Sequence, residues 1–189
     1  MYEDEWRIKV VGDSHIDPII QKKFCKPQII KKKFKELRYI VFDFDGVFTD
    51  NSVYTDQNGN ESVISSKFDG FGLKKLKDIG IGLFILSTEK NKVVEKRAKK
   101  LEIGFLQDLS SNEKATELHK LVQNNNLHYD SVAYMGNDIN DIQCLINCGL
   151  PIAVNDCHPE VIKYADYITD TNGGHGAVRE VCDIIEALK

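Results

Sequence analysis

From residue 36 to its end, the chain alternates short apolar runs with segments of helical periodicity. The apolar runs are bounded by polar residues or glycine, as in buried parallel strands: Tyr39–Phe44, Leu83–Leu86, Ile103–Leu106, Val132–Met135 and Ile152–Val154. Apolar residues at helical spacing lie in the intervening and final segments: Gly70–Ile79, Asn91–Leu101, Glu113–Val122, Ile139–Ile146 and Ala177–Leu188. This alternation predicts an α/β fold with a parallel sheet between helices.

One segment departs from the alternation. Ser52–Ile64 has strand-like ends around Asn58-Gly59, and Asn-Gly is the strongest short signal for a hairpin turn. We therefore expect a β-hairpin inserted at about residues 52–64, after the first core strand. The stretch from Thr49 to Ser87 has room only for this hairpin and one helix, so we expect no large cap domain.

Residues 1–35 have a different character. Trp6–Val11 is compatible with one short strand, and seven lysines lie between residues 22 and 35. The simplest interpretation of the lysines is a solvated helix or linker face rather than a phosphate- or lipid-binding arm, because the run is interrupted and the chain is acidic overall. We predict an N-terminal extension over 1–35 and one folded domain over 36–189.

Composition limits the class of partner. The net charge is −4 and the isoelectric point about 5.8, which argues against a nucleic-acid partner. No apolar run approaches the roughly 18 residues of a membrane span, and the acidic N-terminus is unlike a signal peptide. Five cysteines without a C-x-x-C pair indicate reduced thiols. These features predict a cytoplasmic protein without a membrane partner.

Two acidic clusters follow predicted strands. Asp43 and Asp45 end the first strand and leave it on the same side, because side chains alternate along a strand. Asn137, Asp138 and Asp141 follow Val132–Met135. Ligands of open α/β sheets bind at the carboxyl ends of the strands. Such a concentration of carboxylates needs a cation, and Mg²⁺ prefers oxygen ligands. We predict a magnesium site formed by Asp43, Asp45, Asn137 and Asp138, supported by Asp141.

A hydroxyl and an ammonium lie between the two clusters. Ser87 ends the strand Leu83–Leu86, and Lys114 lies near the start of a helix. Together they supply the hydrogen bonds and charge neutralisation that phosphoryl transfer requires. Taken singly, Lys114 is compatible with a surface position and the second cluster with a helix N-cap. The order of all four elements favours a phosphoryl-transfer site.

That order resembles the haloacid dehalogenase superfamily of phosphatases, whose motifs are D-x-D-G-(V/L)-x-T, a Ser or Thr, a Lys, and G-(D/N)-(D/x)-x-x-D. Here they correspond to Asp43–Thr49, Ser87, Lys114 and Gly136–Asp141. The resemblance implies a Rossmann-like fold, Mg²⁺ as cofactor, Asp43 as a nucleophile that forms an aspartyl-phosphate, and Asp45 as general acid and base whose backbone carbonyl also binds the metal. It makes Ser87 and Lys114 phosphoryl-binding residues.

The last motif departs from the family at its first metal position. The family often has Asp there, and this chain has Asn137. An amide oxygen still ligates Mg²⁺ but carries no charge. Whether Asn137 or Asp138 is the direct ligand therefore stays open.

Within the superfamily the chain resembles a capless subgroup. This subgroup contains 3-deoxy-octulosonate 8-phosphate phosphatases, nonulosonate (sialic acid type) 9-phosphate phosphatases and the C-terminal domains of some acylneuraminate cytidylyltransferases. Thr49-Asp50-Asn51, Asp69–Gly72 and Gly173–Glu180 support the resemblance. It implies hydrolysis of a 2-keto-3-deoxy sugar-acid phosphate for cell-surface glycans such as lipopolysaccharide or sialylated polymers. It also implies a homotetramer in which the 52–64 hairpins help to close neighbouring sites.

Details after the Ser position favour a nine-carbon substrate over an eight-carbon one. Octulosonate phosphatases usually carry Gly-Arg there, whereas this chain has Thr88-Glu89-Lys90; Glu89, expected in the first turn of a helix, and Lys100 resemble the nonulosonate branch. His175 occupies a position usually held by Arg, and Arg179 is a further candidate anion contact. The full candidate set for phosphate or substrate is Gly46, Thr49, Asp69, Ser87, Thr88, Glu89, Arg97, Lys100, Lys114 and His175.

A second class of function stays open at this point. The chain could be a non-catalytic tetramerising or regulatory domain associated with an acylneuraminate cytidylyltransferase. The substitution at Asn137 and the unassigned residues 1–35 motivate it. The intact Asp43 and Asp45 pair argues against it, because a scaffold has no need of two adjacent carboxylates at a strand end.

Overall fold

The computed structural model describes residues 27–189, and its centre is a six-stranded sheet in which every pairing is parallel. The strand order is β5-β4-β1-β6-β7-β8. The strands are β1 (Tyr39–Phe42), β4 (Gly82–Leu86), β5 (Gly104–Leu106), β6 (Val132–Gly136), β7 (Leu150–Ala153) and β8 (Tyr167–Ile168). The predicted α/β architecture is confirmed.

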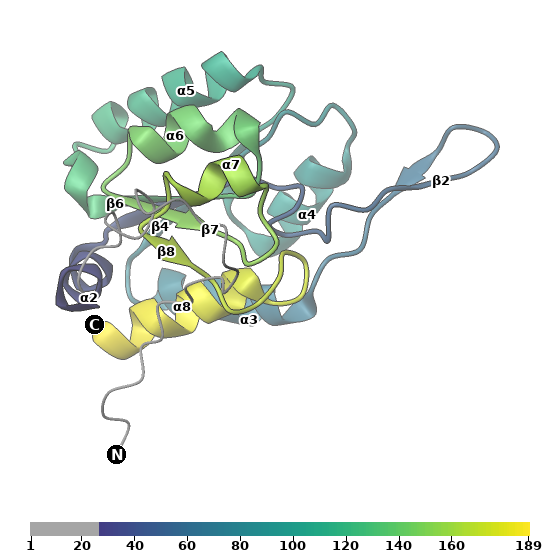
Figure 1. The fold of residues 1–189 in the computed structure, drawn as a ribbon. Coiled ribbons are helices and arrows are strands. Elements are labelled where there is room, and N and C mark those ends of the chain that lie inside the picture. Colours follow the sequence, from purple (N-terminus) through teal and green to yellow (C-terminus); the bar gives the residue numbers. More distant parts are fainter. Residues whose placement is uncertain (1–26) are drawn as a thin grey trace, which may run out of the picture.

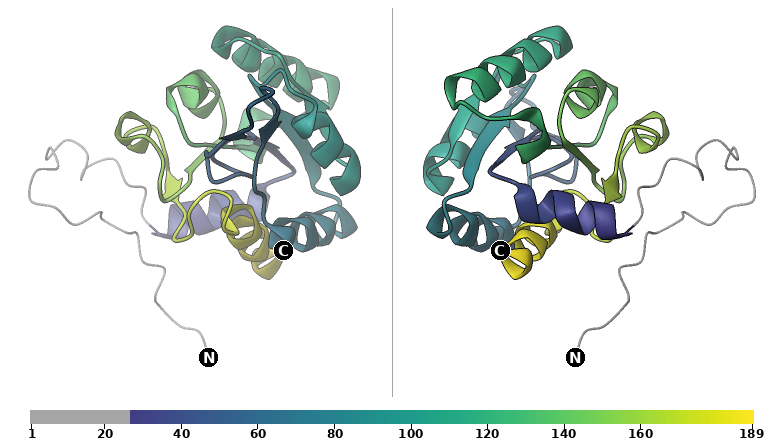
Figure 2. Two further views of the ribbon diagram at one scale, coloured as in Figure 1. Left: turned by 90° about the vertical axis from the view of Figure 1, so that its right-hand side faces the viewer. Right: turned by 90° about the vertical axis from the view of Figure 1, so that its left-hand side faces the viewer.

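Helices cover both faces of the sheet (Figures 1 and 2). Residues of α2 (Pro27–Glu36), α3 (Lys67–Asp78), α4 (Val93–Leu101) and α8 (Ala177–Leu188) share one apolar core with one face of the sheet. Residues of α5 (Ser111–Asn124), α6 (Ile142–Ile146) and α7 (Pro159–Ile162) share a second core with the other face. Two 3₁₀ turns, η1 (Tyr129–Ser131) and η2 (Ile139–Asp141), flank β6.

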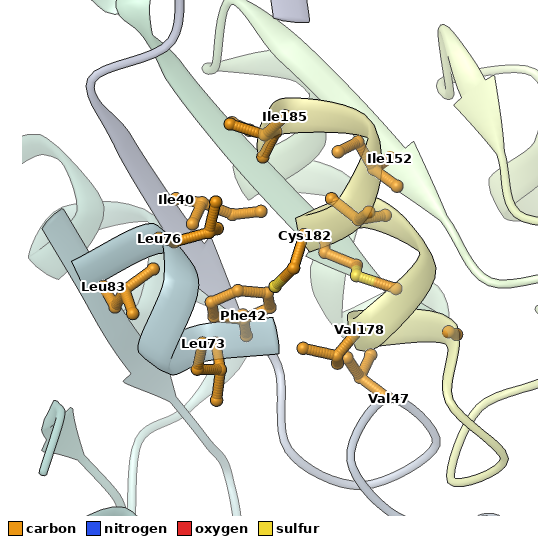
Figure 3. Close-up of a cluster of buried hydrophobic side chains, with 14 of the residues drawn as sticks. Ile40, Phe42, Val47, Leu73, Leu76, Leu83, Ile152, Val178, Cys182 and Ile185 are labelled. Carbon is orange, nitrogen blue, oxygen red and sulfur yellow. The ribbon is translucent and has the colours of Figure 1, made fainter. Parts of the chain in front are cut away.

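The two cores arise from side-chain alternation along buried strands. Ile40 and Phe42 of β1 belong to the first core, whereas Val41 between them belongs to the second. Figure 3 shows the first core, in which Phe42 lies among Leu73 of α3 and Cys182 of α8. Because both faces are covered, the strands are apolar throughout, and this produced the unbroken runs in the sequence.

The helix predicted over Ile139–Ile146 is divided: Ile139–Asp141 is 3₁₀, and the α-helix begins at Ile142. The cause is the side chain of Asp138, whose Oδ1 accepts a hydrogen bond from the amide of Ile139 and begins a tight turn. β8 and α7 were not predicted, because two and four residues are too short for a periodic signal.

The predicted hairpin is present. β2 (Tyr54–Thr55) and β3 (Glu61–Ser62) pair antiparallel and project from the domain (Figure 1). The connecting turn is held by Asp56, whose Oδ1 accepts hydrogen bonds from the amides of Asn58 and Asn60, at 2.8 and 2.9 Å. Gly59 has a φ of +79°, which an Asn-Gly turn requires.

The lysine-rich segment forms α2 in its described part, and this helix packs on the domain. Phe34 is buried, with its ring edge-on to Tyr167 at a centroid distance of 5.2 Å. Lys33 Nζ donates to Gly149 O at 2.8 Å and to Asp166 Oδ2 at 2.5 Å. The strand predicted at Trp6–Val11 lies outside the described residues. Within 27–189 there is no helix with the length and apolar character of a membrane span.

Candidate active site

The loop after β1 carries the two candidate catalytic carboxylates. Asp43 directly follows β1, and its amide donates to Met135 O at 2.9 Å, which continues the pairing with β6. The chain then turns at Gly46, with a φ of +76°. A Cβ on Gly46 would lie 1.9 Å from Asn137 Nδ2, so only glycine lets this loop approach the loop after β6. The two acidic clusters are therefore neighbours, as predicted.

Lys114 joins the two clusters. Helix α5 begins next to the site because Ser110 and Glu113 form a capping box at its N-terminus. This places the fully buried Lys114 in the first turn, with Nζ 2.9 Å from Asp43 Oδ1 and 2.6 Å from Asp141 Oδ1. A buried ammonium is stable only with such partners. Lys114 is thus part of the site.

Asp141 is a structural centre of this site. Its Oδ1 also accepts a hydrogen bond from Tyr134 OH at 2.7 Å, and its Oδ2 accepts from the amides of Asn137 and Asp138 at 2.9 and 3.2 Å. Asp141 therefore orients Lys114 and shapes the loop after β6. Sequence analysis missed Tyr134, because a tyrosine within an apolar strand resembles a core residue. The hydroxyl of Tyr134 is the feature that could have identified it, because a buried hydroxyl needs a hydrogen-bond partner.

The charges of the site are strongly coupled. Burial and the charge of Asp141 raise the pKa of Asp43 and Lys114 lowers it, and the net result is a pKa of about 7. Burial also tends to lower the pKa of Lys114, but Asp43 and Asp141 outweigh it and hold that pKa above its ordinary value. Lys114 therefore stays charged at neutral pH. One ammonium faces two carboxylates, so the cluster favours an additional cation.

The residues present fit a divalent metal. Asn137 Oδ1 is buried and accepts no hydrogen bond, which is costly unless a cation approaches it. Asp138 Oδ1, by contrast, accepts from the amide of Ile139 at 2.6 Å. In residues 27–189 no three His, Cys, Asp or Glu side chains gather as a metal cluster. Mg²⁺ usually takes one or two carboxylates together with water and substrate phosphate, and Asp43 and Asn137 could supply the protein's share of such ligands.

Asp45 is half-buried, two residues after Asp43. Thr49 is buried and donates from Oγ1 to Asp45 Oδ1 at 3.3 Å, while the amide of Gly46 donates to Thr49 Oγ1 at 3.1 Å. Burial raises the pKa of Asp45, and the charge of Glu89 adds to this. A carboxyl group that holds its proton more tightly than usual is suited to protonating a leaving group.

Ser87 follows β4 directly and is buried. Its amide donates to Leu106 O at 3.0 Å, and its Oγ accepts from the amide of Glu89 at 3.0 Å. The adjacent Thr88 is exposed. Like Asp43 and Asn137, Ser87 directly follows or ends a central strand, so the structure places it at the same edge of the sheet.

The expectation that Glu89 sits in the first turn of a helix is wrong. Helix α4 begins only at Val93, and Glu89 lies in the preceding loop. The reason is local: Glu89 Oε1 accepts from the amides of Lys90 and Asn91 at 2.6 and 2.9 Å, which folds a turn before the helix. Lys100 is exposed in the last turn of α4, at the end of the helix away from Ser87.

Four other residues that the sequence predicted to bind the substrate or an anion occupy different places. Asp69 is fully buried at the junction of α3 and α8, so its carboxylate is not available to a substrate in this structure. Arg97 donates from Nη2 to Ser66 O at 2.6 Å and thereby ties α4 to the start of α3. His175 is exposed, and its Nδ1 donates to Gly173 O at 2.8 Å. Arg179 pairs with Asp183 at 2.7 Å.

Comparisons with known proteins agree with this geometry. The family model for haloacid dehalogenase-like hydrolases matches residues 13–181. The 3-deoxy-D-manno-octulosonate 8-phosphate phosphatase of Salmonella typhi is 36% identical over 156 residues, which cover 82% of each chain. The crystal structure of the Yersinia pestis phosphatase of the same name has a TM-score of 0.80 at 33% identity, covering 84% of this chain and 85% of that one.

A further structure includes ligands. The 3-deoxy-D-manno-octulosonate 8-phosphate phosphatase of Moraxella catarrhalis, in complex with magnesium ion, phosphate ion and KDO, has a TM-score of 0.82 at 32% identity. The match covers 87% of this chain and 94% of that one. With the family model spanning most of the sequence and the motif residues gathered at one sheet edge, this chain belongs to the haloacid dehalogenase-like hydrolases.

Proposed function

We propose that this hydrolase releases phosphate from 3-deoxy-D-manno-octulosonate 8-phosphate, an eight-carbon sugar acid. The observation that carries the proposal is Asp43, a buried carboxylate bound to the buried ammonium of Lys114 and two residues from Asp45. The relatives named above, which act on this substrate by name, support the choice of ester.

In the first half of the reaction, Asp43 attacks the phosphorus atom. Lys114 binds Oδ1, so Oδ2 is the oxygen available for attack. The bond from phosphorus to the sugar oxygen breaks while the new bond to Asp43 forms, and Asp45 gives its proton to the leaving oxygen. Lys114 and the hydroxyl of Ser87 stabilise the negative charge on the transferring group.

In the second half, water attacks the phosphorus atom of the aspartyl-phosphate. Asp45, now ionised, accepts a proton from this water, and the bond between phosphorus and Asp43 breaks. The products are inorganic phosphate and the restored carboxylate. Each proton that Asp45 loses in the first half is recovered in the second.

Mg²⁺ is the cofactor we propose, held by the Asp43 carboxylate, the backbone carbonyl of Asp45 and Asn137 Oδ1. The unpartnered oxygen of Asn137 supports it as the direct ligand in place of Asp138. When bound, the ion would neutralise charge on the phosphate oxygens.

A nine-carbon nonulosonate 9-phosphate, favoured by the motif after Ser87, is the second candidate substrate. Its support is the sequence Thr88-Glu89-Lys90 in place of Gly-Arg, together with the charge of Glu89 that reaches Asp45. Lys100, its proposed partner, lies away from the site. The named relatives therefore move the eight-carbon ester to first place.

The test is phosphate release from both sugar-acid phosphates and from a small generic ester, p-nitrophenyl phosphate, with Mg²⁺ and with EDTA. We expect the highest kcat/KM with the eight-carbon ester and no turnover in EDTA. A preference for the nine-carbon ester would replace the proposed substrate. Full activity in EDTA would contradict the metal. No hydrolysis of any ester would revive the non-catalytic alternative.

A further inference from the structure

Helix α8 begins with an N-cap residue that has no side chain. Gly176 occupies this position with a φ of +108°. The amide of Arg179, in the first turn of α8, donates instead to Asp69 Oδ1 at 3.1 Å. Asp69 belongs to the first turn of α3, so one helix supplies the capping carboxylate of another. A carboxylate at this place satisfies an open amide and complements the helix dipole.

The contact requires α3 and α8 to approach closely. A Cβ on Gly72, one turn after Asp69, would lie 2.9 Å from both Arg179 Cδ and Cys182 Cβ. Asp69 has no exposed surface, and its Oδ2 accepts no hydrogen bond. Burial of a half-satisfied carboxylate is unfavourable for folding. The charges of Arg97 and Arg179 offset part of this cost, but the one hydrogen bond to the carboxylate comes from a backbone amide, and such incomplete pairing suggests a role other than stability.

The turn that precedes α8 lies against the nucleophile loop. The amide of Gly174 donates to Val47 O at 3.0 Å. A Cβ on Gly173 would lie 1.9 Å from Gly46 O, and one on Gly174 would lie 2.3 Å from the amide nitrogen of Asp50. There is no room between the two loops, so a shift of one displaces the other.

The other end of this turn is anchored separately. The amide of Gly173 donates to Asp156 Oδ1 at 2.9 Å, and Glu180 accepts from the amides of Asp170 and Thr171, both at 2.9 Å. The turn is thus fixed by Asp156, which follows β7, and by Glu180 of α8. The position of α8 relative to α3 depends on the apolar core, on Asp69, and on two ion pairs nearer the solvent, in which Lys75 of α3 lies 3.2 Å from Asp183 and 2.5 Å from Glu186 of α8.

We propose that Asp69 is a positioning residue for the reaction. By capping α8 from α3 it fixes the turn at residues 173–176, and this turn holds Gly46–Asp50 where Asp43 and Asp45 need it. The proposal rests on the phosphatase function argued above. It assigns Asp69 an effect on the chemical step, in contrast to the sequence-based expectation that it binds substrate.

The kinetic test compares Asp69→Ala, Asp69→Asn and Ser66→Ala. Asp69→Ala removes the cap, and we expect kcat to fall about ten- to a hundredfold with both the sugar-acid phosphate and p-nitrophenyl phosphate, because small misplacements are costly in catalysis. KM should change less than threefold. Asp69→Asn keeps the acceptor oxygen and should restore most of kcat. Ser66→Ala is the matched control: it removes the cap of α3 itself, whose Oγ accepts from the amide of Phe68 at 3.1 Å.

A loss confined to KM for the sugar acid, with p-nitrophenyl phosphate unaffected, would return Asp69 to substrate binding and overturn the proposal. An equal loss of kcat in Asp69→Asn and Asp69→Ala would show that the acceptor oxygen of residue 69 is not what matters, and would overturn the proposed capping role. An unchanged kcat in a less stable Asp69→Ala would leave only a structural role. If Asp69→Ala does not fold, Asp69→Ser replaces it, because its shorter side chain loses the contact but remains polar.

Amide hydrogen exchange separates this proposal from the proposed function. Asp69→Ala should speed exchange at Gly174 and Arg179 between about two- and thirtyfold, the range expected from a lost N-cap. Ser66→Ala should speed exchange only in the first turn of α3. If the wild-type protein hydrolyses no phosphate ester, the phosphatase assignment fails, and unchanged exchange at Gly174 would separately overturn the coupling.

Discussion

Asp43 combines a buried position with the nucleophilic role that we propose for it. The same burial that raises its pKa also strips water from the attacking oxygen, while Lys114 keeps the neighbouring oxygen in place. Asp141 has no such freedom, because both its oxygens accept hydrogen bonds from Lys114, Tyr134 and two backbone amides. At this scale, the hydrogen-bond partners of each carboxylate distinguish the proposed nucleophile from the structural group.

Asp43→Asn tests the nucleophile. The amide has nearly the same shape but is a poor nucleophile, so turnover should fall to the background rate while the fold is kept. Phosphate release and thermal unfolding measured on one preparation would check this. Retention of more than a few per cent of the wild-type rate would refute the assignment.

Asp69 predicts a pH dependence of stability. Burial raises its pKa from near 3.8 to about 6. The folded state therefore binds the proton more tightly than the unfolded state, so stability declines as pH rises from about 4 to 6 and is level above that. Asp69→Asn does not titrate at this position. Its stability relative to wild type should increase by up to about 3 kcal/mol across this window, at about 1.4 kcal/mol per pKa unit.

Urea unfolding of both proteins from pH 4 to 7.5 measures this difference. The contributions of other titrating groups to the free energy of unfolding cancel in this comparison as long as the two proteins have the same fold. A flat difference across the window, or one of opposite sign, would show that Asp69 is not strained by burial.

Helix α2 is the element whose role the sequence described least well. Its lysines suggested a solvated face, and Lys32 and Glu36 do lie on such a face. Its other side carries Ile30 and Phe34 into the first core. Because lysine stems flank these two apolar positions, the charge run obscured an amphipathic helix.

Phe34→Ala should lower the free energy of unfolding by about 3–5 kcal/mol, the usual cost of removing a buried aromatic ring. Lys32→Ala, on the exposed side of the same helix, is the matched control and should cost less than about 1 kcal/mol. Urea denaturation measures both. Equal, small effects would mean that α2 is not part of the cooperative domain and would support an extension that ends near residue 35.

At the scale of the whole molecule, the hairpin and the start of α3 are notable because they expose large apolar side chains. Tyr54 and Ile64 are 74% and 73% exposed, and Phe68 and Phe71, at the adjacent start of α3, are 67% and 68% exposed. Large apolar side chains exposed on a projecting hairpin and on the helix that follows it favour association. The tetramer expected from the family resemblance stays a prediction, and these residues are where we place its contacts.

The double variant Tyr54→Lys, Ile64→Lys should dissociate the assembly, because it places charge in the proposed contact. Sedimentation should change from tetramer to smaller species, with a loss of activity if neighbouring hairpins close the sites. Ile146→Lys is the control: it changes a residue that is 53% exposed on α6, outside the hairpin. A wild-type monomer with full activity would exclude the tetramer.

The sequence by itself determined the class of fold and indicated which residues lie together in the candidate active site. Apolar runs with polar ends specify buried parallel strands, and such strands bring their carboxyl ends to one edge, so Asp43, Ser87 and Asn137 had to meet there. Short elements escaped this logic because β8 and α7 contain too few residues to show a period.

Only the tertiary structure decided how polar groups pair across the chain. The sequence indicated that Asp69 binds substrate, but in the structure its carboxylate accepts a hydrogen bond from the amide of Arg179, 110 positions away. The sequence placed Glu89 in a helix, but in the structure its carboxylate accepts a hydrogen bond from the amide of Asn91 in its own loop. The hydrophobic periodicity of a sequence indicates which side chains are buried. A hydrogen-bond partner depends on distances between elements that packing alone sets, and no local pattern encodes them.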